Sequence, residues 1–246
     1  MNPLPDKGNI RVEKRSPYCD LARVQADVAR LGAAAFTKTA LDGGRIMGLT
    51  TLEMLAVIAS LTRHNFYKID DGLRRSSRVA GRLLRGNTGS QGRLYQDHLA
   101  RYGACDPVQG EVTVARKCLN CDARRSMTRF EGETFSIEHA GETETVDGLS
   151  GWRCQACGEV EFDADSARRY AAAGDELVLR DRERQRKEIR RIRRKLGLSQ
   201  VAAARLTGGG HNAFSRYERG EATPLPAVLN LFRLLDKHPE LLKDLV

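Results

Sequence analysis

In the first sixty residues, apolar positions recur at spacings of three and four, which is the pattern of amphipathic helices. A first helix is expected from Asp20, its N-cap, to Leu31, and its apolar stripe consists of Leu21, Val24, Val28 and Leu31. A second helix is expected to follow Thr50 or Thr51 as N-cap and to end before His64. The apolar stripe of this second helix consists of Leu52, Leu55, Ile58 and Leu61.

The pattern changes after Lys68. Residues 71–110 are rich in Arg and Gly, lack sustained periodicity and contain no Phe, Trp, Ile or Met. Such a segment can bury little apolar surface, so we expect it to be disordered. The simplest interpretation of this segment by itself is a basic linker between domains.

Residues 112–162 show short alternating runs separated by glycines, which predict strands at 134–137, 143–146 and 160–162. Asp163 or Asp165 then caps a predicted helix that ends near Ala173. Residues 180–195 are rich in charged side chains, and within this run one helical face is apolar. That face is marked by Ile189, Ile192 and Leu196.

The last fifty residues predict short helices with sharp ends. Ser199 caps the first, which ends at the glycines 208–210, and the second covers about Asn212 to Glu218 and stops at Gly220. Prolines 224 and 226 open a third, Pro239 breaks it, and 241–245 form a last turn or two. The apolar positions of the first and third of these helices are Val201, Ala204, Leu206, Val228, Leu229, Leu231, Phe232, Leu234 and Leu235.

Composition narrows the class of protein. The chain has 246 residues, 30% of them charged, and a net charge of +9. No apolar run approaches the roughly 18 residues that cross a bilayer, which argues against a membrane protein. The N-terminus lacks the apolar core of a signal peptide, so a cytoplasmic location is expected. The basic balance favours a polyanionic partner. In a reducing compartment the six cysteines are expected to be free thiols or metal ligands rather than disulfides.

Four cysteines form two Cys-x-x-Cys pairs, Cys118 with Cys121 and Cys154 with Cys157. A tight turn at each pair lets both sulfurs point at one ion, and four thiolates satisfy tetrahedral zinc. When four sulfurs coordinate the ion, no coordination position stays open for a substrate. The sequence therefore predicts one structural Zn²⁺ and no catalytic role for it. The alternative is two redox pairs or spare thiols, but a thioredoxin-like site needs a βαβ context that is missing here. No role is predicted for Cys19 and Cys105.

Short helix, turn, short helix in a basic segment is the outline of a helix-turn-helix DNA reader. Asn212 and Arg216 lie four apart on the candidate recognition helix, and these residue types can pair with adenine and guanine. Phe214 and Tyr217 lie on another face, suited to packing. Alternatively, Asn212 is only an N-cap and Arg216 a solvated charge. The basic run 180–195 either contacts phosphates or is a solvated helix face.

The stretch GGGHNAFSRYERGEATPLPAVLNLFRLLDKHPELL, preceded by the two cysteine pairs, resembles the MqsA (YgiT-type) antitoxin family over about residues 112–246. The resemblance implies a zinc-binding domain that holds the cognate toxin. It also implies a helix-turn-helix domain of the XRE/Cro type that dimerises and represses its own operon at a palindromic site. The family's zinc ligands fall on Cys118, Cys121, Cys154 and Cys157, and its base-reading residues on Asn212 and Arg216.

The N-terminal part resembles a second family, the MqsR mRNA interferase toxins. VEKRSPYCDLARVQADVAR and LTTLEMLAVIASLTRHNFYK match the opening helices of that family, and the likeness ends at Lys68. The resemblance implies an incomplete RelE-like α/β fold, since the strands that carry most RNA-cleaving residues are missing. The predicted fold class is therefore multidomain and mainly α. Its segments are a toxin fragment at 1–69, the Arg/Gly-rich stretch at 70–111, an α+β zinc-knuckle domain at 112–176 and an all-α domain at 177–246.

The Arg/Gly-rich stretch has a second interpretation. When residues 68–113 are back-translated and one base is removed after the Lys68 codon, a consistent codon choice restores the missing toxin strands, including Trp-Gln-Asp-Val-Tyr. The restored frame ends at a stop that overlaps a GTG at Val112. Residues 70–111 are thus hypothesised to be read out of frame, which sequencing the DNA across codons 66 to 114 would test.

The preferred function is a zinc-containing, dimeric, DNA-binding antitoxin that binds an MqsR-like toxin and is not an enzyme. The alternative is a fusion that still cleaves RNA, but Lys68 alone cannot supply acid, base and cationic stabiliser. A third interpretation is a stand-alone regulator that no longer responds to toxin.

Overall fold

The computed structural model describes residues 20–62, Asn65, 116–121 and 123–245, together with the backbone of strands β1 (Glu13–Lys14) and β2 (Ile69–Asp70). These two strands pair in antiparallel fashion. The chain divides into two compact units, Met1–Asp175 and Glu176–Val246. The predictions for residues 71–110, for Lys68 and for Cys19 and Cys105 lie outside the described residues.

The N-terminal helices are α1 (Leu21–Leu31), α2 (Lys38–Ile46) and α3 (Thr51–Ser60), with a 3₁₀ turn η1 (Gly32–Ala35) between the first two. Asp20 caps α1 by accepting a hydrogen bond from the Ala22 amide. Thr50 caps α3 in a capping box with Glu53, which satisfies two backbone donors at once. Both predicted helices are therefore confirmed, and α2 is an element that the sequence pattern did not predict.

The buried face of α3 differs from the predicted stripe. Met54 and Ile58 are buried, whereas Leu52 is 76% exposed. The prediction for Leu52 was wrong because α1 and α2 both pack against α3 and together select the face that carries Met54. The Gln25 side chain of α1 also donates hydrogen bonds to carbonyl groups at the end of α3, among them that of Leu61 at 3.0 Å.

The sheet of the first unit is antiparallel, in the order β3 (Met127–His139), β4 (Glu142–Cys154) and β5 (Val160–Phe162). The first two strands are far longer than the predicted 134–137 and 143–146. Ala140 and Gly141, both with positive φ, form a two-residue turn from which strand pairing extends. Gly132 lies within β3, where a register shift between Phe130 and Glu133 accommodates it.

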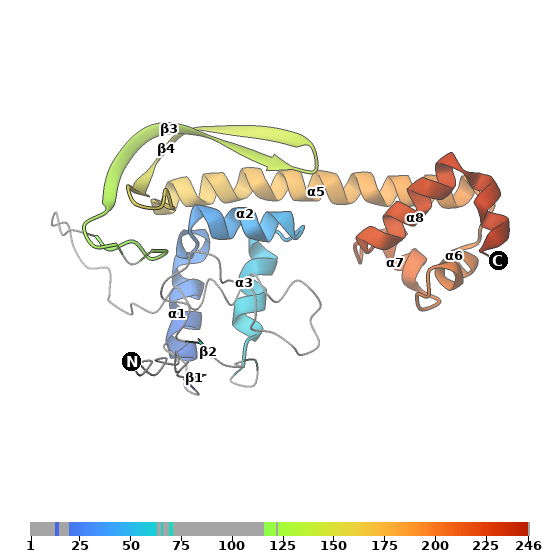
Figure 1. Ribbon diagram of the computed structural model, residues 1–246, viewed down its shortest axis with the longest axis horizontal. Helices are drawn as coiled ribbons and strands as arrows, with labels where there is room; N and C mark the ends of the chain where they lie inside the picture. The colour runs from blue at the N-terminus through green and yellow to red at the C-terminus, as the bar shows by residue number, and fades with distance from the viewer. Residues whose placement is uncertain are drawn as a thin grey trace, which may run out of the picture. The chain divides into compact units, whose positions relative to one another are not determined.

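Helix α5 (Ala164–Lys195) is one continuous element of 32 residues. The predicted end near Ala173 was therefore wrong. Gly174 costs about 1 kcal/mol in a helix relative to Ala, yet the residue is buried and its neighbours' packing outweighs that cost. The β3–β4 hairpin lies along the first part of α5 (Figure 1). There the Tyr170 ring stacks on Phe162 with 4.8 Å between ring centroids.

The second unit contains the end of α5 followed by α6 (Gln200–Leu206), α7 (Ala213–Arg219), α8 (Pro226–Lys237) and a 3₁₀ segment η4 (Pro239–Asp244). Ser199 caps α6 and Gly220 ends α7 with φ of 79°, as predicted. The apolar core consists of Ile189, Ile192, Ala203, Ala204, Phe214, Val228 and Phe232. Val201 and Leu234, both predicted to face the core, are exposed.

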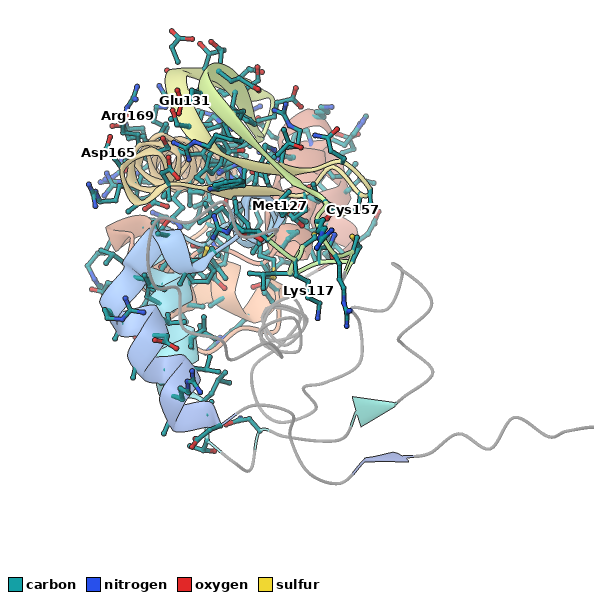
Figure 2. All side chains as sticks on the ribbon, turned by 90° about the vertical axis from the view of Figure 1, so that its left-hand side faces the viewer. Lys117, Met127, Glu131, Cys157, Asp165 and Arg169 are labelled. Carbon is teal, nitrogen blue, oxygen red and sulfur yellow. The ribbon has the colours of Figure 1, made fainter. Side chains whose placement is uncertain are left out.

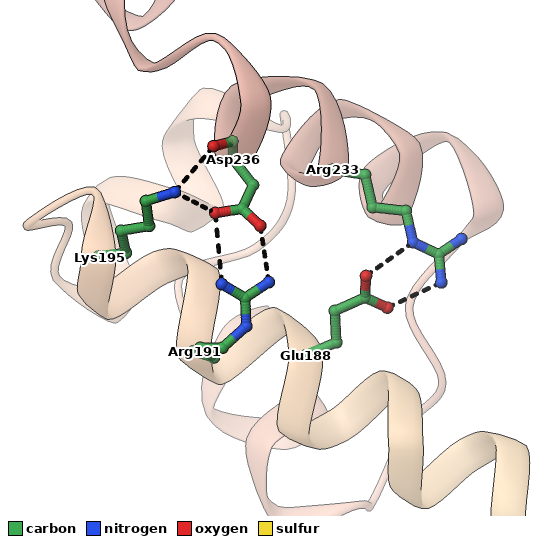
Figure 3. A network of polar contacts seen from close by, with 5 residues as sticks. All are labelled: Glu188, Arg191, Lys195, Arg233 and Asp236. Carbon is green, nitrogen blue, oxygen red and sulfur yellow. Dashed lines mark hydrogen bonds and ion pairs between the residues drawn. The ribbon is translucent and has the colours of Figure 1, made fainter.

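The basic run at the end of α5 does more than face solvent. Arg191 and Lys195 both form ion pairs with Asp236 of α8, at 2.6 and 2.7 Å, and Glu188 pairs with Arg233 at 2.7 Å (Figure 3). These contacts hold the C-terminal part of α5 against α8. In the described part of the chain, no helix is long and apolar enough to span a membrane.

Candidate metal centre and nucleic-acid interface

The four cysteines come together because a hairpin closes the 32 residues between the two pairs. Cys118 and Cys121 precede β3, and Cys154 ends β4 opposite Met127 at the start of β3. Cys157 follows in the turn before β5, where the Gly158 amide bonds to the Cys154 carbonyl. Gly158 has φ of 76°, which is the backbone conformation that the predicted tight turn requires.

The geometry of the four sulfurs suits a tetrahedral metal ion. All four lie within 4.8 Å of one another. The Sγ atoms of Cys118 and Cys157 are 3.7 Å apart, as are those of Cys121 and Cys154. Zinc–sulfur bonds of about 2.3 Å place tetrahedral sulfurs about 3.8 Å apart, so an ion of this size fits between them.

The surroundings of the sulfurs also favour a bound cation. The backbone amide of Asn120 donates to the Cys118 sulfur at 3.3 Å, as knuckle turns do toward a thiolate. Burial raises the pKa of Cys118, because a thiolate is poorly solvated there, and partial desolvation also raises the pKa of Cys157 on the exposed side of the cluster. Burial acts the same way on Cys154, but hydrogen bonds with Ser126 and backbone amides outweigh it and lower its pKa to about 6. A divalent ion would offset the cost of desolvating the ionised thiolates by pairing with them.

Apolar and aromatic groups enclose one side of the cluster. Met127 and Trp152 pack against Cys118 and Cys154, both of which are fully buried. The guanidinium of Arg116 lies 5.0 Å from the centre of the Trp152 ring. Figure 2 shows Lys117, Met127 and Cys157 together on one side of the ribbon, away from Asp165 and Arg169 of α5. The cluster is thus half enclosed, with Cys121 and Cys157 on its exposed side.

The second candidate site is the N-terminal end of α7. Asn212 and Arg216 are both exposed and lie four residues apart. Asn212 occupies the N-cap position, but its side chain makes no capping hydrogen bond, so that alternative lacks its expected interaction. Phe214 is fully buried against Phe232, with ring centroids 4.9 Å apart, and anchors the opposite face of α7.

One buried carboxylate that fixes α7 was not predicted from the sequence. The Glu218 carboxylate is buried and receives two hydrogen bonds from the Arg193 guanidinium, at 2.5 and 3.1 Å. Gln200 of α6 donates a third at 2.9 Å. Glu218 follows Phe214 by four residues and shares its inner face, and a carboxylate on a core face needs a cationic partner. The four-residue spacing of Phe214 and Glu218 was therefore the sequence feature from which a buried, ion-paired Glu218 could have been predicted.

Two family comparisons bear on this arrangement. Residues 116–246 match the model described as the antitoxin component of a bacterial toxin-antitoxin system, MqsA. This match covers more than half of the chain.

The chain belongs to the MqsA antitoxin family.

The MqsA-family region contains both the four-cysteine cluster and helices α6 to α8. A curated relative, Antitoxin MqsA of Escherichia coli (strain K12), is 54% identical over 57 residues, which is 23% of this chain and 44% of that protein. The match therefore spans less than half of the relative's length.

The N-terminal residues match a different family model, described as the motility quorum-sensing regulator, toxin of MqsA, over residues 16–75. This confirms the second resemblance and extends it seven residues beyond Lys68. One chain thus carries a toxin-family segment ahead of an antitoxin-family region.

Proposed function

We propose that this chain acts as a cytoplasmic type II antitoxin and autorepressor. In this proposal, it binds one structural Zn²⁺ through Cys118, Cys121, Cys154 and Cys157. It reads operator DNA with Asn212 and Arg216 and neutralises an MqsR-like toxin. The observation that supports DNA reading is the arrangement of α7, whose inner face is fixed by Phe214 and Glu218 while Asn212 and Arg216 stay exposed.

The helices α6 and α7 fit the helix-turn-helix arrangement of the XRE/Cro type. A reader of this type binds palindromic sites as a two-fold dimer, so we propose a homodimer through residues 177–246. Exposed apolar side chains in this unit, among them Leu225 and Leu234, offer surface for such an interface. With all four coordination positions filled by sulfur, the proposed zinc ion supplies folding energy and no catalysis.

DNA reading is tested by Asn212→Ala and Arg216→Ala. Each is expected to weaken operator binding by about 1–3 kcal/mol and to relax preference at one base pair per half-site. Fluorescence anisotropy against a promoter fragment and single-base variants measures both effects. The exposed Asn230 and Arg168 lie outside α6 and α7, so N230A and R168A are matched controls. Equal loss on all sequences, with a changed salt slope, would instead assign the two residues to phosphate contacts.

The toxin-family segment is proposed to be inactive as a ribonuclease. General acid–base chemistry on a phosphodiester needs several groups around the scissile phosphate, and Lys68 supplies one. The purified chain is expected to leave mRNA intact to the same extent as a Lys68→Ala variant. Cleavage by the parent chain that disappears in K68A would establish the alternative of an active fusion.

A further inference from the structure

Within the first unit, the toxin-family helices contact the antitoxin-family region directly. The Tyr170 hydroxyl of α5 donates to the Asp42 carboxylate of α2 at 2.6 Å. The Thr51 amide, at the start of α3, donates to the Asp175 carboxylate at 2.7 Å, and the Thr51 hydroxyl donates to the same oxygen at 3.0 Å. In the first turn of α2, the Thr39 amide donates to the Glu159 carboxylate at 3.2 Å. Three antitoxin-family side chains thus accept from or donate to two toxin-family helices.

The contact is desolvated at its centre. Arg45 of α2 is only 4% exposed, pairs with Asp42 at 2.9 Å and lies over the Tyr170 ring at 5.4 Å from its centroid. Lys38 pairs with the same carboxylate at 2.6 Å. A charged side chain loses its hydration when buried to this degree, and the Asp42 carboxylate and the Tyr170 ring offset part of this loss, while the Arg45 Nε has no hydrogen-bond partner among the described residues.

The α5 backbone is shaped to receive that guanidinium. A Cβ atom at Gly174 would lie 2.5 Å from two nitrogen atoms of Arg45, Nε and Nη2. Glycine is unfavourable inside a helix, yet here its missing side chain makes room for a group from the toxin-family segment. The surface formed by Glu159, Tyr170, Gly174 and Asp175, called the docking surface below, therefore fits α2 and α3 in shape and in charge.

We propose that the docking surface is a toxin-binding surface that the chain's own α2 and α3 occupy, and that this occupancy weakens binding of an intact MqsR-like toxin. The inference rests on the proposed toxin neutralisation. A toxin that presents the same helices needs the same surface. Because α2 and α3 belong to the same chain, they compete at an effective concentration of up to about millimolar, without a second molecule.

The test frees the docking surface without changing it. The double variant Asp42→Ala, Arg45→Ala removes the central ion pair from the toxin-family side. Asp27→Ala, Arg30→Ala is the matched control, because it removes an Asp–Arg pair of the same spacing on α1 that is exposed. Binding is measured by calorimetric titration with the toxin partner of the Escherichia coli antitoxin MqsA. The Asp42, Arg45 variant is expected to bind this toxin at least about tenfold more tightly than the parent, and the α1 control is expected to bind it as the parent does.

Amide hydrogen exchange of the full chain measures the docking itself, without added toxin. The Thr51 amide and α2 are expected to exchange at least about tenfold faster in the Asp42, Arg45 variant and in Gly174→Ala, which displaces Arg45 from the α5 side. The α1 control should exchange as the parent does. Unchanged exchange in both variants would overturn the docking.

The outcomes separate the two ideas. Faster exchange combined with equal toxin affinity in parent and variant would overturn the occlusion and leave the proposed function standing. Failure of parent, variant and control to bind the toxin would contradict toxin neutralisation itself and, with it, the occlusion, while the exchange rates would still decide whether α2 and α3 dock.

Discussion

Replacing Cys154 with serine is expected to abolish zinc binding and to unfold the residues around the four-cysteine cluster. The cluster is small, and its enclosing core of Met127 and Trp152 buries little apolar surface without the ion. Structural zinc contributes apparent binding energies of about 10–16 kcal/mol to domains of this kind, and that energy is folding energy. Removing one ligand or adding a strong chelator should therefore have the same effect.

Trp152 makes this result easy to observe. It is the single tryptophan of the chain and packs against the cluster, so its fluorescence reports on this region alone. The metal content of the purified chain is measured in parallel, with Cys105→Ser as the matched control that keeps all four sulfurs. The parent and C105S should hold one zinc ion each, and C154S none. A full equivalent of zinc in C154S would refute the four-ligand assignment.

The helical core around Phe214 and Phe232 contains no cysteine, so chelation should leave α6 to α8 folded. Amide exchange of these helices, compared before and after chelation, measures this independence. Loss of protection there on chelation would show that the two units unfold together.

Replacing Arg193 with methionine is expected to destabilise the second unit by about 3–5 kcal/mol, since it removes the cation that hydrogen-bonds the buried Glu218 carboxylate and leaves only Arg190, at 4.0 Å. The two side chains are 12% and 7% exposed, and the guanidinium also donates to the Leu198 carbonyl at 2.7 Å. Arg193 thereby joins α5 to α7 and to the loop before α6. Urea unfolding followed by circular dichroism measures the loss, and operator binding should fall with it.

The double variant R193M, E218L separates the cost of an unpaired charge from any intrinsic value of the pair. Because it buries no charge, it should recover most of the lost stability. If instead it is as unstable as R193M, the loss comes from packing around the arginine stem. The exposed pair Arg168 and Asp165 serves as the control, and R168M should change stability by less than about 0.5 kcal/mol.

The same pair predicts an opposite pH dependence in parent and variant. Burial tends to raise the pKa of Glu218, but hydrogen bonds from Arg193 and Gln200 outweigh it and hold the pKa below its ordinary value of 4.5. A lowered pKa means that this contribution is full above pH 4.5 and is lost as the pH falls through the folded value. In R193M burial should dominate, so acidification toward pH 4.5 should stabilise the variant rather than weaken it.

Much of the candidate site was readable from local sequence. The spacing within each Cys-x-x-Cys pair, followed by Gly158, requires no knowledge of the fold, because the turn that aims two sulfurs at one point is made by four adjacent residues. The caps at Asp20, Thr50 and Ser199 were readable for the same reason. So was the end of α7 at Gly220.

Other features depend on contacts between distant segments. The length of β3 and β4 follows from pairing across the Ala140–Gly141 turn. The continuity of α5 through Gly174 follows from the packing of the α5 residues before and after it. The partners of the basic run were likewise hidden, since Asp236 lies more than forty residues from Arg191 and Lys195.

The sequence by itself determined the two family resemblances, the two cysteine pairs, the short helices and the break in composition after Lys68. Each of these is encoded within a few neighbouring residues. Only the tertiary structure decided that Leu52 faces outward and Met54 inward, that Glu218 is neutralised by Arg193, and that α2 and α3 lie on the antitoxin-family region. The physical reason is that burial of a side chain depends on which surfaces meet, and those surfaces come from parts of the chain that no local pattern connects.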